Sequence, residues 1–162
     1  MTYYNPVFHY GLEQFSKDCT KANVSGIIVP DVPLEEEAEL KAALSSSEVA
    51  IIRLATLTTP DDRLKKITED AEGFIYAVTV NGVTGEHDGY KQEVYDNLER
   101  IKSMSSIPVC AGFGIQSAES AAALGEYTDG VIVGSKIVTL LNEGRGSRIQ
   151  NLIPKRQAEH AK

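Results

Sequence analysis

Short runs of apolar and mostly β-branched residues recur along the chain, and each is followed by a longer segment of mixed polarity. The runs begin near residues 26, 49, 73, 107 and 130. Within a run, apolar residues scarcely alternate with polar ones, which is typical of strands in a parallel sheet that is covered by helices. The pattern therefore predicts parallel strands at these five places.

The segments between the runs carry the signals of helices. Thr59 and Pro60, followed by two aspartates, form a typical helix start with acidic residues at the positive end of the helix dipole. A step of about 23 residues between most runs is the length of one strand, one loop and one helix. Residues 1–6 fit the end of a further strand and its loop. We therefore expect an α/β fold of about six βα units that begins inside a strand.

The composition is that of one globular domain, with 162 residues of which 42% are hydrophobic and 24% charged. The net charge of −7 and the pI of about 5.0 argue against nucleic acid or an anionic membrane as a partner. No apolar run approaches the roughly 20 residues of a membrane span. Cys19 and Cys110 lack the spacing of a metal site or a disulfide framework. We therefore expect no metal and a cytoplasmic location.

The C-terminal segment differs in character from the rest. Residues 145–162 contain five basic residues and one acidic residue, and Pro154 interrupts any continuous helix there. We therefore divide the chain into a main body, residues 1–144, and a basic tail, residues 145–162, which we expect to be poorly docked.

Three glycine-bearing loops follow three successive predicted strands, at residues 81–85, 112–115 and 134–135. Glycine lets the backbone approach an anion closely, and the start of a helix offers unpaired N–H groups and a positive dipole. Ser135, directly after Gly134, adds a hydroxyl group. Any one such loop is more often only a turn, but three in consecutive βα loops favour a phosphate-binding site.

The order of four motifs resembles the α subunit of tryptophan synthase over about residues 1–142. The motifs are residues 1–6 with Tyr-Gly at 10–11, Pro-Asp-Val-Pro at 30–33, Asn-Gly-Val-Thr-Gly at 81–85, and Gly-Phe-Gly-Ile at 112–115 with Gly-Ser beyond. The resemblance implies a TIM (β/α)₈ barrel that cleaves indole-3-glycerol phosphate to indole and glyceraldehyde 3-phosphate, without metal or cofactor. It also implies a β subunit that carries pyridoxal phosphate and receives the indole in an α₂β₂ complex.

The resemblance assigns roles to individual residues of this chain. The phosphate donors would be Gly85, Gly114, Gly134 and Ser135. The active-site tyrosine would be Tyr76, and the lid-loop threonine would be Thr84. The indole pocket would include Tyr3, Ile28 and Phe113. The positions that face the β subunit would be Asn5, Asp31 and Pro33.

Two family features have no counterpart in this sequence. The general acid/base glutamate and the indole-binding aspartate of the family lie on or just after its second strand, whereas this chain matches from the third strand onward. The resemblance therefore implies strands equivalent to 3–8 and an incomplete barrel, since a complete one takes about 250 residues. We expect the truncated chain to have weak or no lyase activity alone.

Other interpretations stay open. One is a non-catalytic phosphate-binding fragment that docks on a β subunit or on a partner that completes the barrel, and another is a different phosphate-binding barrel enzyme. Open strand edges also favour a homo-oligomer. Asp31, the best remaining acid at a strand end, fits a βα-turn or interface residue better than a replacement base. Glu86, His87 and Asp88 fit a solvated lid better than a metal site.

Overall fold

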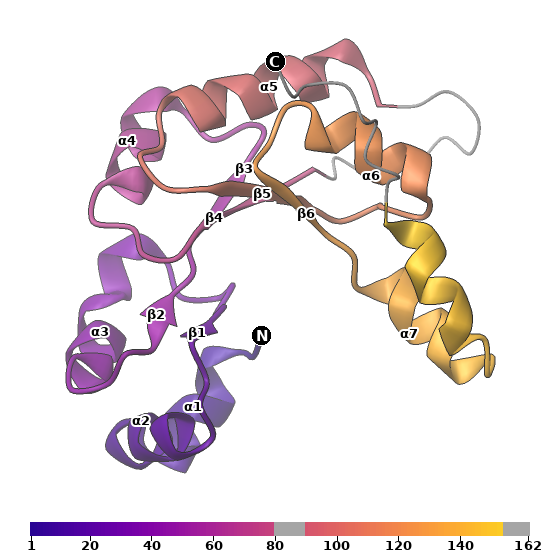
Figure 1. Ribbon diagram of the computed structural model, residues 1–162. Helices are drawn as coiled ribbons and strands as arrows, with labels where there is room; N and C mark the ends of the chain where they lie inside the picture. The colour runs from indigo at the N-terminus through magenta and orange to yellow at the C-terminus, as the bar shows by residue number, and fades with distance from the viewer. Residues whose placement is uncertain (80–89, 154–162) are drawn as a thin grey trace, which may run out of the picture.

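The computed structural model describes residues 1–79 and 90–153, and parallel strands form its centre (Figure 1). Every strand pair in this part of the chain is parallel. The strands are β1 (Gly26–Ile27), β2 (Ala50–Ile51), β3 (Leu54–Thr56), β4 (Ile75–Val78), β5 (Val109–Gly112) and β6 (Gly130–Ile132). The α-helices are α1 (Tyr4–Tyr10), α2 (Leu12–Lys21), α3 (Ala38–Leu44), α4 (Asp61–Thr68), α5 (Gln92–Ser103), α6 (Ala118–Gly125) and α7 (Ser135–Asn142). The 3₁₀ helices are η1 (Leu34–Glu36) and η2 (Gly146–Leu152). The predicted α/β fold with helices between parallel strands is confirmed.

One segment of chain, residues 50–56, joins two sheets. Its first half, β2, pairs with β1, and its second half, β3, begins the order β3-β4-β5-β6. The backbone N–H of Ile52 donates to the carbonyl of Ile27 (2.8 Å), and the carbonyl of Arg53 accepts from the N–H of Tyr76 (2.9 Å). The strands are therefore arranged in one parallel spatial order: β1, then residues 50–56, then β4, β5 and β6.

The N-terminal segment differs in detail from the expected strand end. Residues from Tyr4 onward form α1, and only residues 1–3 are extended. The N–H of Thr2 donates to the carbonyl of Ile28 (3.0 Å), which places this segment beside the outer edge of β1. The carboxylate of Asp31 accepts from the N–H of Tyr4 (2.9 and 3.1 Å), so it satisfies a free N–H group of the first turn of α1.

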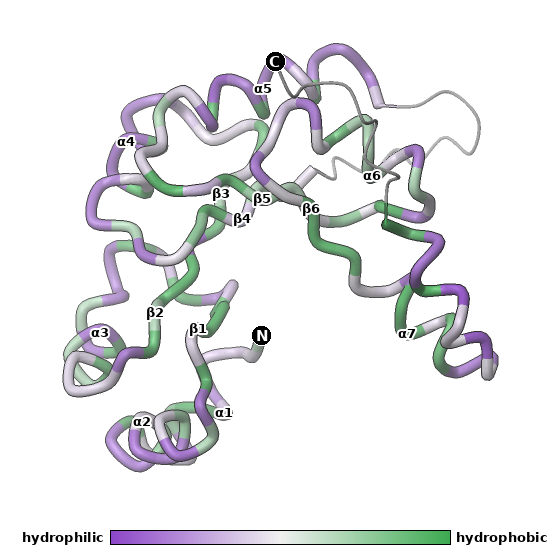
Figure 2. The backbone as a smooth tube through the Cα atoms, viewed as in Figure 1, coloured by the Kyte–Doolittle hydropathy of each residue, from purple (hydrophilic) through white to green (hydrophobic). Residues whose placement is uncertain are grey.

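The main hydrophobic core lies between β3–β6 and the helices that pack on them. Ala55, Ala77 and Ala111 occupy equivalent positions on adjacent strands and are fully buried. They contact a cluster that includes the helical residues Leu64, Leu98, Ile101 and Leu124. Figure 2 shows hydrophobic residues concentrated along the strands. A second, smaller cluster lies under α1, α2 and α3 and includes Val7, Leu40 and Val49.

The opposite face of the strands is less covered. Leu54, Tyr76, Cys110 and Gly130 stand side by side in register, and Leu54, Cys110 and Gly130 are only half-buried. In a complete TIM barrel this face would be the packed interior. With β1 and β6 at the two ends of the strand order, the expected incomplete barrel is confirmed.

The beginning of the basic tail is docked rather than loose. The 3₁₀ helix η2 contacts both α6 and α7, and Leu152 is buried. The expectation of a poorly docked tail is therefore wrong for residues 146–152, because this segment contacts two helices and buries Leu152. Residues 154–162 lie outside the described part of the chain. Within the described part, no helix is long and apolar enough to cross a membrane.

Candidate phosphate and indole site

The carboxyl ends of β4, β5 and β6 meet at one edge of the sheet. Val78 pairs with Gly112, and Gly112 pairs with Ile132. The loop that begins after Gly112 therefore leaves the sheet next to the one that leads to Gly134. This adjacency is what the glycine-bearing loops predicted. Thr84 and Gly85, in the loop at residues 81–85, lie outside the described residues.

The loop after β5 bends sharply. Phe113 and Gly114 both have left-handed backbone conformations, with φ of +76° and +79°. At Gly112 a side chain is excluded, because a Cβ atom built there would overlap the phenol oxygen of Tyr76. Gly112 thus lets the tyrosine ring lie directly against the backbone of β5.

The start of α7 provides the second group of N–H donors. The carbonyl of Gly134 accepts from the N–H groups of Ile137 (2.9 Å) and Val138 (3.2 Å), which closes the first turn. The N–H groups of Ser135 and Lys136 have no earlier carbonyl within the helix to bond. Gly134 and Ser135 are exposed. This helix start therefore offers donors and the positive end of a dipole to an anion beside the loop at Gly114.

Tyr76 and Phe113 form an aromatic pair next to these donors. Their ring centroids are 5.8 Å apart and the rings meet at 61°. Tyr76 is 6% exposed, whereas Phe113 is 47% exposed. Burial raises the pKa of the Tyr76 phenol, so this hydroxyl stays protonated at neutral pH and is able to donate. A buried donor beside an exposed ring suits an aromatic ligand with a polar end.

The other two expected pocket residues lie at the far end of the strand order. Ile28 is half-buried after β1, and Tyr3, 66% exposed, lies beside it through the bond from Thr2. Leu54 stands between the two groups, because it neighbours Tyr76 in register and faces the same side. Sequence reasoning missed Leu54, because the apolar run that contains it scarcely alternates and gives no signal of the face on which Leu54 lies.

Asn5, Asp31 and Pro33 are all exposed, and the bond between Asp31 and Tyr4 brings Asn5 and Asp31 together. The Asp31 carboxylate is occupied by that bond. Asp31 therefore holds the turn after β1 against α1, and its hydrogen bonds within the described part of the chain do not include Tyr76 or Phe113.

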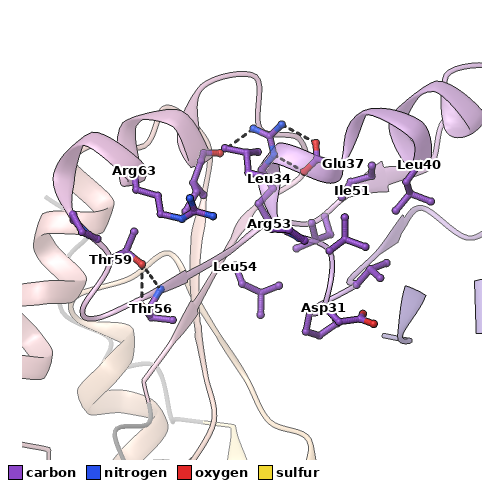
Figure 3. Close-up of a pocket in the computed structure, with 17 residues that line it drawn as sticks. Asp31, Leu34, Glu37, Leu40, Ile51, Arg53, Leu54, Thr56, Thr59 and Arg63 are labelled. Carbon is purple, nitrogen blue, oxygen red and sulfur yellow. Dashed lines mark hydrogen bonds and ion pairs between the residues drawn. The ribbon is translucent and has the colours of Figure 1, made fainter. Parts of the chain in front are cut away.

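A cavity of about 500 Å³ lies between the β1–η1 loop and the β3–α4 loop, and its lining includes Asp31, Pro33 and Leu54 (Figure 3). The guanidinium of Arg53 donates to both carboxylate oxygens of Glu37 (3.1 and 2.8 Å) and to the carbonyl of Ile67 (3.0 Å). Both charged side chains are almost buried. Their hydrogen bonds are made within the protein, so this ion pair holds α3 and α4 on the sheet rather than offering a charge to a ligand.

Metal-binding clusters of three or more His, Cys, Asp or Glu side chains are not found in residues 1–79 and 90–153. The segment with Glu86, His87 and Asp88 lies outside these ranges. Cys19 and Cys110 are both free thiols.

Parallel strands joined by helices, with glycine loops at their carboxyl edge, place the chain in the α/β class of TIM-barrel proteins. A family model described as "Tryptophan synthase alpha chain" matches residues 1–161. The chain belongs to the tryptophan synthase alpha chain family. The match continues through nearly all of the basic tail, beyond the resemblance that ended at about residue 142.

Individual relatives agree with the family. The tryptophan synthase alpha chain of Oceanobacillus iheyensis is 49% identical over 153 residues, which are 94% of this chain and 58% of that protein. The alpha chain of Bacillus anthracis (strain CDC 684) is 46% identical over 162 residues, with 99% and 63% covered. The chain therefore spans about 60% of the length of the curated relatives it matches.

Solved structures give the same result. The tryptophan synthase subunit alpha of Campylobacter jejuni superposes with a TM-score of 0.82 at 33% identity, over 93% of this chain and 62% of that one. A structure of the tryptophan synthase a2b2 complex from Pyrococcus furiosus gives a TM-score of 0.83 at 32% identity, over 94% and 64%.

Proposed function

We propose that this chain serves in the cleavage of indole-3-glycerol phosphate to indole and glyceraldehyde 3-phosphate, a step of tryptophan biosynthesis. Membership of the family supports this assignment. The observation that carries it is the adjacency of the bent loop at Gly114, the start of α7 and the pair of Tyr76 and Phe113. These groups provide anion donors and an aromatic surface side by side.

In this proposal backbone and hydroxyl donors hold the substrate phosphate. They belong to Gly85, Gly114, Gly134 and Ser135. Phe113, Ile28 and Tyr3 contact the indole ring, and Tyr76 stays neutral and contributes a hydroxyl group. Thr84 lies in the loop next to Gly85. The chain itself uses no metal or cofactor, and pyridoxal phosphate belongs to a partner β subunit.

The chemical step is a retro-aldol cleavage, which needs a group that protonates indole C3 and one that removes the proton of the glycerol hydroxyl. Carboxylates perform this work well near neutral pH when their pKa is raised. The strand positions of β3–β6 on the face of Tyr76 carry no carboxylate, since they hold only Leu, Thr, Tyr, Val, Cys, Gly and Ile. We therefore propose low turnover for the chain alone, by about 10² to 10⁴-fold relative to a complete family member.

The partner in this proposal is a β subunit of tryptophan synthase. The solved a2b2 complex from Pyrococcus furiosus supports such an assembly for a relative. We assign the exposed Asn5, Asp31 and Pro33 to the contact. A cytoplasmic location belongs to the same proposal and fits the two free thiols.

The first test is binding of glycerol 3-phosphate, followed through the backbone amide signals of the chain. We expect saturable shifts at Gly114, Gly134 and Ser135. Ser135→Ala should weaken binding by about tenfold, because a hydrogen bond to a charged group is worth about 1.5–3 kcal/mol. Ser103→Ala, which removes a hydroxyl from the end of α5, is the matched control.

Turnover of indole-3-glycerol phosphate, measured as release of indole, completes this test. We expect a low rate of indole release, and Ser135→Ala should lower this rate further. Absence of glycerol 3-phosphate binding, or equal binding by the Ser135 and Ser103 variants, would contradict the phosphate assignment.

A further inference from the structure

We propose that Thr79 is a positioning residue, whose hydroxyl group directs the N–H donors of the loop after β5 toward the phosphate. The proposal deepens the function proposed above and rests on it for the identity of the anion. Thr79 directly follows β4 and is not among the residues to which the family resemblance assigns a role. It is 4% exposed.

Thr79 touches the bend of the neighbouring loop at two points. Its backbone N–H donates to the carbonyl of Gly112 at 3.0 Å. Its Oγ1 lies 2.7 Å from the carbonyl oxygen of Gly112 and 2.7 Å from that of Phe113. One hydroxyl proton is therefore shared between two consecutive carbonyl groups, and both are held on the β4 side of the loop.

The conformation of Phe113 needs such support. Three residues other than glycine have a positive φ in the described part of the chain, namely Asn23, Asp70 and Phe113. Asn and Asp tolerate this conformation because their short polar side chains bond locally, whereas a bulky aromatic residue adopts it rarely. The contacts that hold Phe113 are the hydroxyl of Thr79 at its carbonyl and the ring of Tyr76 at its side chain.

Peptide planarity connects these contacts to the anion site. In a trans peptide unit, the carbonyl of one residue and the N–H of the next point in opposite directions. Since the Phe113 carbonyl points at Thr79, the N–H of Gly114 points away from β4. In the order β4-β5-β6, the side away from β4 is the side of β6 and of the start of α7. The hydroxyl of Thr79 thus turns a donor of the β5 loop toward the donors at Ser135.

The test compares Thr79→Val, which keeps the shape but removes the hydroxyl, with Thr79→Ser, which keeps the hydroxyl but removes a methyl group. The probe is glycerol 3-phosphate, titrated into each chain and followed at the amide of Gly114. We expect Thr79→Val to weaken binding by about tenfold, the usual scale for one lost hydrogen bond to a buried group, and Thr79→Ser to stay within about twofold of the wild type. Ile101→Val, in the core away from the loops, controls for a general loss of stability.

A second readout does not depend on phosphate. In the free chain, nuclear Overhauser effects between the rings of Tyr76 and Phe113 and the backbone shifts of Phe113 report the bend. Thr79→Val should lose or change these signals, and Thr79→Ser should retain them. If the wild type binds no glycerol 3-phosphate, the proposed function is contradicted. The Phe113 signals of the two Thr79 variants still test whether Thr79 holds the bend.

The proposal is overturned if Thr79→Val keeps the Phe113 signals. Equal loss of affinity in the Val and Ser variants would also overturn it, as would a loss in Thr79→Val no larger than that in Ile101→Val.

Discussion

At the scale of single residues, Gly112 decides how closely Tyr76 approaches the backbone of β5. The phenol ring occupies the space where any other residue would place its Cβ atom. The same ring contacts Phe113, whose left-handed backbone begins the bend. Because Gly112 has no Cβ atom, the ring of Tyr76, the bend at Phe113 and the N–H donors of the loop all lie at the end of β5.

Gly112→Ala should therefore destabilise the chain and weaken binding of glycerol 3-phosphate. Inserting a methyl group into a packed region costs about 1–3 kcal/mol. The measurement is the midpoint of thermal unfolding together with the phosphate titration. Gly125→Ala is the matched control, because Gly125 ends a helix and a Cβ atom there meets nothing within 4 Å. Equal midpoints of thermal unfolding for the two variants would show that the Tyr76 side chain does not exclude a methyl group at position 112.

The candidate phosphate donors could be proposed from the sequence, because glycine and serine residues in consecutive loops are visible there. The fit of Gly112 to Tyr76 and the contact of Thr79 with Phe113 could not. Both depend on the register between β4 and β5, which brings together residues more than 30 positions apart. No local pattern encodes that register.

At the scale of elements, one apolar run gives two short strands with different neighbours, because its first half pairs with β1 and its second half with β4. The run at 49–54 predicted a single strand, and the structure gives β2 and β3 on either side of Ile52 and Arg53. The Arg53 guanidinium reaches out to Glu37, at the start of α3, and to carbonyls at the end of α4. The hydrophobic pattern predicted the strand, but it did not predict that β1 would pair with its first half and β4 with its second half.

The loop after β1 illustrates a second limit of sequence reasoning. Asp31 was expected at the β subunit interface, and the structure shows that its carboxylate also holds the first turn of α1. Asp31→Asn removes the charge but keeps an oxygen that accepts the Tyr4 N–H. This variant therefore tests the charge of Asp31 without removing its contact with α1.

Asp31→Asn should weaken binding of a tryptophan synthase β subunit by up to about fivefold, since an exposed ion pair is worth up to about 1 kcal/mol. Isothermal titration calorimetry measures the affinity. Glu99→Gln, which removes an exposed charge from α5, should leave it unchanged. If both variants bind alike, Asp31 contributes no charge to the interface.

At the scale of the whole molecule, the order of the strands leaves two ends, β1 and β6, and a half-exposed inner face. Large apolar side chains are exposed at both ends, including Phe8 and Tyr10 on α1 and Val138 and Leu141 on α7. The family resemblance implied this open arrangement, because the chain matches the family from its third strand onward. The sequence did not predict the docking of η2, because we interpreted the basic composition of residues 145–162 as a sign of a poorly docked tail. The burial of Leu152 became visible only in the structure.

We therefore expect the isolated chain to associate. Strand edges at β1 and β6 and exposed apolar side chains both favour contact between copies. Light scattering should give a mass that rises with concentration. Ile132→Lys, which places a charge on the inner face of the edge strand β6, should lower that mass. A monomer mass at every concentration would contradict the expectation.

The segment 50–56 lies between two separate hydrophobic cores, so the two parts of the chain are able to unfold locally at different free energies. The two hydrophobic cores lie on either side of it, with α1, α2 and α3 over the smaller core and α4, α5 and α6 over the larger. Amide hydrogens in α1, α2 and α3 should therefore exchange with solvent in partial openings that leave β4 and β5 protected. The loop at Gly114 lies on the side of the larger core, and the residues assigned to the β subunit, Asn5, Asp31 and Pro33, lie on the side that we expect to open first.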